Sequence, residues 1–169
     1  MAFVVEDGSG STTATSWISV ADADTYATEV GLTSWTGTSG AKQTALIKAQ
    51  RYITQVYRGS WKGQRSNETQ ALDWPRIGVY DADGWLIAST TIPQALKEAQ
   101  VELAARALTA DLVSDVATTD AAIASESSNV GGVSYGVTYV GGKATQKSYP
   151  VADMLLAHLT YGSGEIVRG

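Results

Sequence analysis

Apolar residues recur at helical spacing over residues 39–57. They form one face of the predicted helix: Leu46, Ala49, Ile53 and Val56. Basic residues recur at the same spacing on the opposite face: Lys48, Arg51 and Arg58. This pattern predicts an amphipathic helix over 39–57, ended by Gly59, with a basic stripe (Lys48, Arg51 and Arg58) along its exposed side.

A longer stretch, 91–112, is apolar on two faces. The first face holds Leu96, Ala99, Leu103, Ala107 and Ala110, and the second holds Val101, Ala105, Leu108 and Leu112. Thr91 is the expected cap of this helix, and Pro93 suits its first turn. Two apolar faces are typical of a central helix, packed between neighbours of its own chain or between subunits.

Two shorter helices are expected nearer the ends of the chain. Ser19 followed by Asp22 is an N-cap pattern that predicts a helix over 20–30, and Gly31 suits its C-cap. Apolar residues at helical spacing predict the last helix over 149–160.

Valine and tyrosine alternate with small residues over 133–140, which predicts a β-strand carrying Tyr135 and Tyr139. Glycines at 141–142 suit a turn, and residues 143–147 are the expected return strand. A lone hairpin is marginally stable in water, so we expect this one to rest on a helix or on another copy of the chain.

We expect one domain made of consecutive parts: an arm or loop (1–16), a helical core (17–112), a polar loop with the β-hairpin (113–148), a helix (149–160) and a docking tail (161–169). The tail carries Ile166, Val167 and Arg168, which suit docking in an extended form, although a frayed terminus is the alternative. The expected fold class is mainly α: a small bundle of about four helices with a β-hairpin and extended N- and C-terminal arms.

Composition limits the function classes. The 169 residues include no cysteine, which excludes disulfides, thiolate metal sites and cysteine nucleophiles. A net charge of −5 argues against general nucleic-acid binding, for which a basic surface is typical. No apolar run reaches the length of a membrane helix, and the N-terminus lacks the basic region of a signal peptide. We therefore expect no membrane partner, and use in a cytoplasm or in a particle assembled there.

Charge is unevenly distributed along the chain. All charged residues in 41–65 are basic, and nearly all of those in 98–126 are acidic. Opposite charges of this kind can join copies of a protein to each other or to a charged partner, and two solvated faces are the alternative. The candidate interface residues are Lys48, Arg51, Arg58, Glu98, Glu102, Tyr135, Tyr139, Ile166, Val167 and Arg168.

Trp61 and Trp74 lie in an irregular stretch beside Lys62 and Arg65. Aromatic and basic residues in one loop indicate either a recognition surface or an anchor for the fold. Because a residue that precedes proline avoids helical conformation, Trp74 should end any local helical turn. We interpret Trp61, Trp74 and Pro75 as structural anchors.

Catalytic motifs are missing from the sequence. One histidine, His158, cannot build a multi-histidine metal site, and no Gly-x-Ser-x-Gly nucleophile elbow occurs. The glycines before Lys143 lack the spacing of a phosphate-binding loop. We therefore expect a protein that is not an enzyme and has no cofactor or metal.

Six motifs follow one another along the chain: Val4-Val5-Glu6-Asp7-Gly8, Trp17-Ile18-Ser19-Val20-Ala21-Asp22-Ala23-Asp24-Thr25-Tyr26, Ala45-Leu46-Ile47-Lys48-Ala49, Trp61-Lys62-Gly63-Gln64-Arg65, Gln70-Ala71-Leu72-Asp73-Trp74-Pro75-Arg76 and Ile92-Pro93-Gln94-Ala95-Leu96-Lys97-Glu98-Ala99. In this order they resemble a family of small proteins from tailed-phage structural gene clusters, some labelled DnaT-like single-stranded DNA-binding protein. The chain is also similar to head–tail connector (adaptor, head-completion) proteins. The resemblance is good over 4–112.

The connector resemblance implies a non-enzymatic adaptor that forms a ring, commonly of twelve copies, between the portal and the tail of the virion. Arms, hairpin and tail would reach neighbouring copies, the portal protein and a tail or neck protein. Double-stranded DNA would pass through the lumen without specific binding, which suits an acidic protein. Assembly would take place in the host cytoplasm.

Two alternatives remain. A single-stranded DNA-binding replication accessory would need a basic groove with aromatic stacking platforms. Its candidates here are Tyr57, Trp61, Trp74, Lys62 and Arg65. A neck or tail-completion protein would differ from the adaptor only in its partner.

Overall fold

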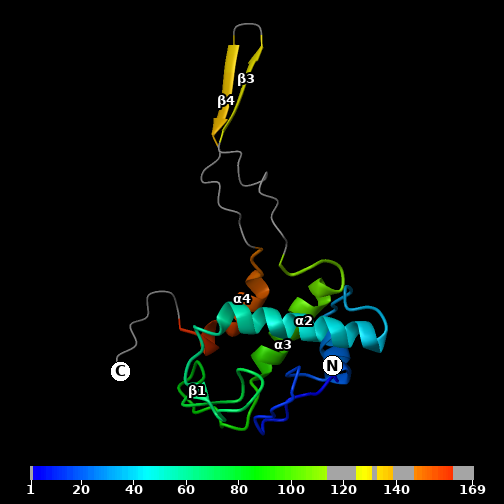
Figure 1. Ribbon diagram of the computed structural model, residues 1–169, viewed down its shortest axis with the longest axis vertical. Helices are drawn as coiled ribbons and strands as arrows, with labels where there is room; N and C mark the ends of the chain where they lie inside the picture. The colour runs from blue at the N-terminus through cyan, green and yellow to red at the C-terminus, as the bar shows by residue number, and fades with distance from the viewer. Residues whose placement is uncertain (1, 114–124, 131–132, 139–146, 162–169) are drawn as a thin grey trace. The chain divides into compact units, whose positions relative to one another are not determined.

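The structure is a computed structural model that describes residues 2–113, 125–130, 133–138 and 147–161 (Figure 1). It divides into two compact units, Met1–Leu112 with Tyr149–Gly169, and Val113–Ser148. The elements of the first unit are α1 (Val20–Glu29), α2 (Ser39–Tyr57), β1 (Gln64–Arg65), β2 (Arg76–Ile77), α3 (Gln94–Ala107), α4 (Pro150–Leu156) and the 3₁₀ turn η1 (Ala157–Leu159). The second unit holds β3 (Ser125–Val130) and β4 (Val133–Thr138). Four helices and a β-hairpin confirm the expected, mainly α class.

Side-chain caps begin the first two helices: Ser19, which was predicted, and Thr38, which was not. The hydroxyl of Ser19 accepts a hydrogen bond from the Asp22 N–H at 3.1 Å, and that of Thr38 accepts from the Ala41 N–H at 3.2 Å. Both bonds satisfy a backbone donor that has no partner within the helix. The observed bounds of α2 are those that its apolar periodicity predicts.

The apolar face of α2 turns at its C-terminal end. Leu46, Ala49 and Ile53 are buried as predicted, whereas Val56 is 42% exposed. Tyr52 is buried in its place, and its ring packs edge-on against that of Tyr149 with the centroids 5.3 Å apart. The prediction for Val56 was wrong because the residues before α4 cover a neighbouring face of the last turns of α2.

Helix α3 is central but shorter than the stretch 91–112 predicts. Pro93 takes the N-cap position without a side-chain hydrogen bond, so Thr91 is not the cap. After Ala107 the chain tightens, since the N–H of Thr109 bonds the carbonyl of Arg106 at 3.1 Å. Between these ends α3 contacts α1, α2 and α4, so neighbours in its own chain already cover both of its apolar faces.

A buried glutamine links α3 to the start of the chain and to α2. Gln100 is fully buried, and its amide oxygen accepts from the Trp17 N–H at 3.0 Å. Its amide nitrogen donates to the Ser16 hydroxyl at 2.9 Å and to the Leu46 carbonyl at 3.0 Å. Because each polar atom of the amide has a partner, the burial of this polar group is compensated.

Residues before α1 form a loop closed by a buried carboxylate. Glu6 is 3% exposed and accepts backbone hydrogen bonds from Gly8, Gly10 and Ser11, each at 2.9 Å. Val5 pairs in parallel with Ser16, which brings the two ends of the loop together. The segment 1–16, expected to be an arm or loop, is a loop over its described part.

The hairpin pairs β4 with a different partner from the predicted one. Strand β4 falls within the predicted 133–140, and it pairs antiparallel with the preceding β3, from Ser125↔Thr138 to Val130↔Val133. Of the stretch 143–147, predicted as the return strand, residues 143–146 lie outside the described residues. β-Propensity reflects packing context, so the polar sequence of β3 concealed a strand. Two consecutive glycines, 131–132, separate the strands and are a typical sequence for a two-residue hairpin connection.

Candidate functional site

The stretch between α2 and β2 carries Trp61 and Trp74, and we call it the tryptophan loop. It places both indole rings inside the core. Trp61 is 4% exposed and Trp74 is fully buried, and their rings meet edge to face with the centroids 6.0 Å apart. Tyr57 adds a tilted contact to Trp61 at 5.8 Å, and Pro75 is also fully buried. Within the described residues neither indole N–H of this pair has a hydrogen-bond partner, so apolar packing holds the rings. The three expected anchors are thus core residues, and these indoles are not available for base stacking.

Residues 159–161, which follow α4, bond to this loop. The Lys62 N–H donates to the Leu159 carbonyl at 3.0 Å, and the Tyr161 N–H donates to the Ser60 carbonyl at 2.7 Å. Nearby, the Tyr57 hydroxyl donates to the Asp153 carboxylate. Burial, with this hydrogen bond as the second cause, raises the pKa of Tyr57. These contacts fix the residues around Trp61 on both sides.

Arg76 serves the loop and is turned away from solvent. Its guanidinium donates to the carbonyls of Lys62 at 2.7 Å, Gly63 at 2.6 Å and Asp73 at 3.2 Å. Burial lowers the pKa of Arg76, although the side chain keeps its charge at neutral pH. With three carbonyls bound, Arg76 is a brace between β1 and β2 and offers little to a phosphate.

The other two arginines near the loop, Arg58 and Arg65, also bond groups of the loop itself. Arg65 donates to the carbonyl of Gln70 at 3.1 Å and of Glu68 at 3.3 Å, although its side chain stays exposed. Arg58 forms an ion pair with buried Asp73 at 3.4 Å. Both contacts lie within the tryptophan loop, so most of its positive charge stabilises the loop itself.

The basic stripe of α2 is partly used inside the chain. Lys48 pairs with Asp111 at 3.1 Å, and Arg58 pairs with Asp73. Arg51 is exposed, and within the described residues it forms no ion pair with a carboxylate. Of the stripe, Arg51 is therefore the residue most available to a partner.

The acidic candidates on α3 differ from each other. Glu98 accepts a hydrogen bond from Gln94 at 3.1 Å at the surface. Glu102 is 8% exposed; it accepts a hydrogen bond from Tyr26 at 3.4 Å and pairs with Arg106, one helical turn later, at 2.8 Å. Burial and then the Glu102 and Glu98 carboxylates raise the pKa of Tyr26 to about 12. The carboxylate of Glu102 thus has its partners within the chain.

The other candidate interface residues lie on β4 or outside the described residues. Tyr135 lies on β4, for which the structure gives strand pairing only. The rest lie outside the described residues: Tyr139, Ile166, Val167 and Arg168.

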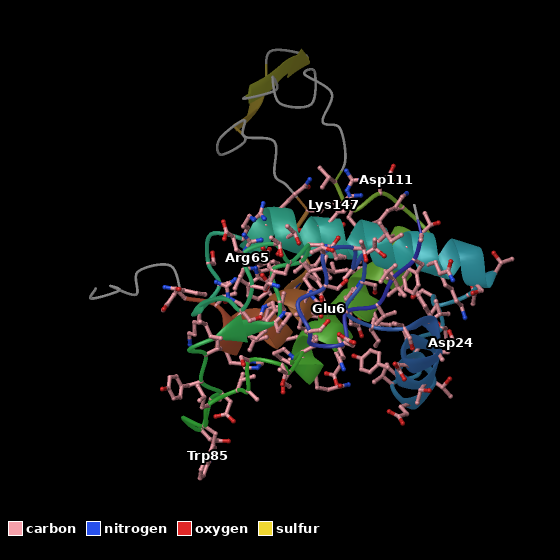
Figure 2. All side chains as sticks on the ribbon, turned by 60° about the horizontal axis from the view of Figure 1, so that its bottom comes forward. Glu6, Asp24, Arg65, Trp85, Asp111 and Lys147 are labelled. Atoms are coloured by element: carbon pink, nitrogen blue, oxygen red, sulfur yellow. The ribbon has the colours of Figure 1, made fainter. Side chains whose placement is uncertain are left out.

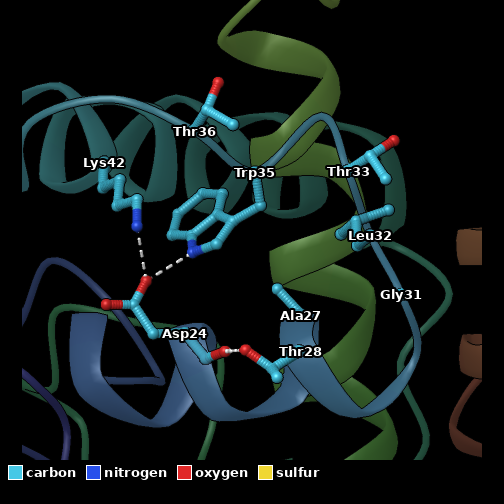
Figure 3. A pocket seen from close by; sticks show the side chains of 9 residues that line it. All are labelled: Asp24, Ala27, Thr28, Gly31, Leu32, Thr33, Trp35, Thr36 and Lys42. Carbon is cyan, nitrogen blue, oxygen red and sulfur yellow. Dashed lines mark hydrogen bonds and ion pairs between the residues drawn. The ribbon is translucent and has the colours of Figure 1, made fainter.

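A hollow of about 410 Å³ lies between α1 and the start of α2 (Figure 3). One carboxylate oxygen of Asp24 accepts from the Trp35 indole at 2.6 Å and from the Lys42 ammonium at 2.7 Å. The ammonium also lies 5.3 Å from the Trp35 ring centroid, a cation–π distance. The hydrogen bond from Lys42 is the main reason why the pKa of Asp24 is lowered. No sequence pattern indicates this triad, because its members come from separate segments.

The largest exposed aromatic side chain lies on the turn around Gly84, a turn that the sequence pattern indicates without indicating the exposed indole. Trp85 is 74% exposed, and Figure 2 shows it at the end of its loop, directed away from the helices. Tyr80, 55% exposed, and Leu86, 61% exposed, are bridge partners in the same hairpin. Large exposed apolar groups that lie together are typical of interaction surfaces.

Neither a metal-binding cluster nor a membrane-spanning helix is found in the part of the chain that the structure describes. No group of three or more histidine, aspartate or glutamate side chains there could hold a metal ion. None of its helices combines the length and the apolar character that crossing a bilayer requires.

The full chain, residues 1–169, matches the family described as "Putative DnaT-like ssDNA binding protein". No curated protein and no solved structure matches significantly. The description concerns single-stranded DNA and does not mention a connector, so it favours the alternative over the adaptor interpretation. Because the match covers every residue, the chain belongs to this DnaT-like family.

Proposed function

We propose that this protein is a structural, non-enzymatic component of a tailed-phage virion, a head–tail adaptor that forms a ring between portal and tail. The observation that favours this role over nucleic-acid binding is the buried Trp61–Trp74 pair with Arg76 bound to three carbonyls. The most distinctive motif of the chain is therefore used to build the fold. The resemblance of its motif series to connector proteins supplies the role.

Two further properties support assembly into a ring. The β3–β4 hairpin has two strands, and hairpins of this size need a packing partner to be stable in water. A net charge of −5 would let double-stranded DNA pass through a lumen without being held by its phosphates. The proposed partners are copies of the same chain, twelve in a complete ring, with the portal protein on one side and a tail or neck protein on the other.

Light scattering and negative-stain imaging of the purified protein, with and without purified portal, test this proposal. The expected result is a ring, alone or on the portal, and loss of joined tails from virions that lack the protein. A protein that neither assembles nor binds portal, together with normally joined tails in its absence, would contradict the proposal.

Single-stranded DNA binding is the second candidate, favoured by the family description and by one observation. Tyr80 and Trp85 are exposed aromatic side chains that follow β2, and β2 pairs with β1, which carries exposed Arg65. Aromatic platforms beside basic side chains are what sequence-independent binding to single strands uses. This candidate stands second because the same turn carries Asp81 and Asp83, which repel phosphate.

Fluorescence anisotropy with a labelled oligonucleotide near physiological salt tests the second candidate. Micromolar or tighter binding that weakens with salt, and that Trp85→Ala and Arg65→Ala both reduce, would support it. Met154→Ala is the matched control, because Met154 is 70% exposed and lies on α4. No binding by the unsubstituted protein would exclude this role.

A further inference from the structure

The turn that carries Trp85 is held by its own hydrogen bonds. The carboxylate of Asp81 accepts from the N–H groups of Asp83 at 3.0 Å and Trp85 at 2.8 Å. The Asp81 N–H donates to the Trp85 carbonyl at 2.9 Å, and Gly84 takes the positive φ of 86° that the turn requires. The backbone is thus fixed while the indole remains in solvent. We call residues 80–86 the Trp85 tip.

The Trp85 tip combines an apolar surface with negative charge. Its exposed apolar groups are Tyr80, Trp85 and Leu86. Asp81 and Asp83 are its only charged residues. A partner must therefore offer an apolar hollow with a positive rim. Nucleic acid fits poorly, because its phosphates would face two carboxylates.

A hollow of this chemistry exists on the same molecule, formed by the N-terminal loop, α2 and the chain near residue 72. It measures about 370 Å³ and is lined by Ala14, Thr15, Ile47, Gln50, Arg51, Ala71 and Leu72. Apolar residues form most of the lining, and Arg51 is its charged member. We call it the Arg51 groove. Its volume is within the range of pockets that hold small organic ligands, so one indole can enter.

We infer that the Trp85 tip of one copy docks into the Arg51 groove of a second copy. The indole fills the apolar hollow, while Asp81 and Asp83 face Arg51, which forms no ion pair with a carboxylate within the described residues. The inference rests on the proposed ring and names the contact between its neighbours. Because tip and groove are different surfaces, the contact is head-to-tail, and repeating it gives a ring when the rotation closes.

Thiol cross-linking tests the contact cleanly, since the chain has no cysteine of its own. Ala82→Cys marks the tip and Ala71→Cys marks the groove; both residues are exposed. The two single variants are mixed and treated with a short bismaleimide. We expect cross-linked dimers in the mixture and few from either variant alone. Ala21→Cys, at an exposed position on α1, is the control partner and should give none with Ala82→Cys.

Two substitutions test the chemistry of the contact by sedimentation. Trp85→Ala should weaken self-association at least about tenfold, as truncation of a central aromatic anchor does. It should leave the fold intact because the side chain is 74% exposed. Asp83→Arg should weaken self-association through repulsion from Arg51, and adding Arg51→Asp should restore it.

The outcomes separate this inference from the proposed function. A monomer at all concentrations, cross-links confined to Ala82→Cys with itself, or full assembly by Trp85→Ala would each overturn the inference. A ring that binds portal but fails these tests leaves the adaptor role standing with a different contact. Tip-to-groove cross-links in a protein that ignores portal leave the contact standing without that role. Loss of oligonucleotide binding, but not of self-association, in Trp85→Ala would assign the tip to nucleic acid instead.

Discussion

The ring edge of one indole points at the other in the Trp61–Trp74 pair, with the centroids 6.0 Å apart and the planes at 88°. This edge-to-face arrangement is one of the two that aromatic quadrupoles favour. It joins residues 159–161, which contact the residues around Trp61, to the segment before β2. The loop that first indicates nucleic-acid recognition is therefore a packing centre of the first unit.

Trp74→Ala should destabilise the protein by about 3–5 kcal/mol, as removal of a buried aromatic ring from a core does. Trp74 is fully buried, and it contacts Trp61 directly. Chemical denaturation measures the change. Trp85→Ala is the matched control and should change stability by no more than about 0.5 kcal/mol. Equal stability of the two variants would show that the buried indole contributes nothing beyond the exposed one.

Gln100→Ala should destabilise by about 1–3 kcal/mol, because it leaves the buried N–H of Trp17 without its acceptor. Denaturant unfolding with an unchanged slope is the measurement. Gln94→Ala, an exposed position on the same helix, removes only a surface hydrogen bond to Glu98 and should be close to neutral. A Gln100→Ala variant as stable as Gln94→Ala would mean that water replaces the lost amide.

Local patterns predicted the elements that local forces build. The caps Ser19 and Thr38 each bond a backbone N–H within their own first turn, and α2 keeps a helical period throughout. The sequence could not show the partners of Glu6 or Gln100, because those depend on how distant segments meet. β3 was missed for the same reason: its polar residues pair only once β4 is beside them.

The candidate site also contains residues whose placement the local sequence indicates and residues whose placement depends on distant contacts. Trp61, Trp74 and Pro75 were interpreted as structural anchors, and all three are buried. The exposure of Trp85 was not predictable, because the sequence shows a turn at Gly84 without showing on which side the indole lies. The Asp24–Lys42 pair also joins two helices, and no periodicity within either helix indicates it.

Gly8→Ala should be strongly destabilising. Gly8 has φ = 99°, and a Cβ there would lie 1.8 Å from the Thr90 carbonyl oxygen. Gly31→Ala is the control, since Gly31 has φ = 69° with open space around it. It should cost only the backbone penalty of about 1–2 kcal/mol. Thermal unfolding of both variants compares them; equal losses would mean that the N-terminal loop moves away from Thr90 without cost.

The Asp24–Lys42 ion pair should make stability depend on pH in the acidic range. The Lys42 hydrogen bond, and to a lesser extent the Trp35 indole, hold the pKa of Asp24 below its ordinary value of 3.8. A lowered pKa in the folded state means that the unfolded state binds the proton more readily. The pair therefore contributes its full stability above pH 3.8, and this contribution is lost as the pH falls through the folded pKa.

Asp24→Asn measures that contribution directly. The difference in unfolding free energy between the unsubstituted protein and Asp24→Asn should be largest near neutral pH and should shrink as the pH falls below 3.8. Lys42→Met should lower the unfolding free energy with the same pH dependence as Asp24→Asn. The double variant should show no additional loss, because both substitutions remove the same interaction. A difference that stays constant across the acidic range would mean that Asp24 supports Trp35 through a hydrogen bond that an amide replaces equally well.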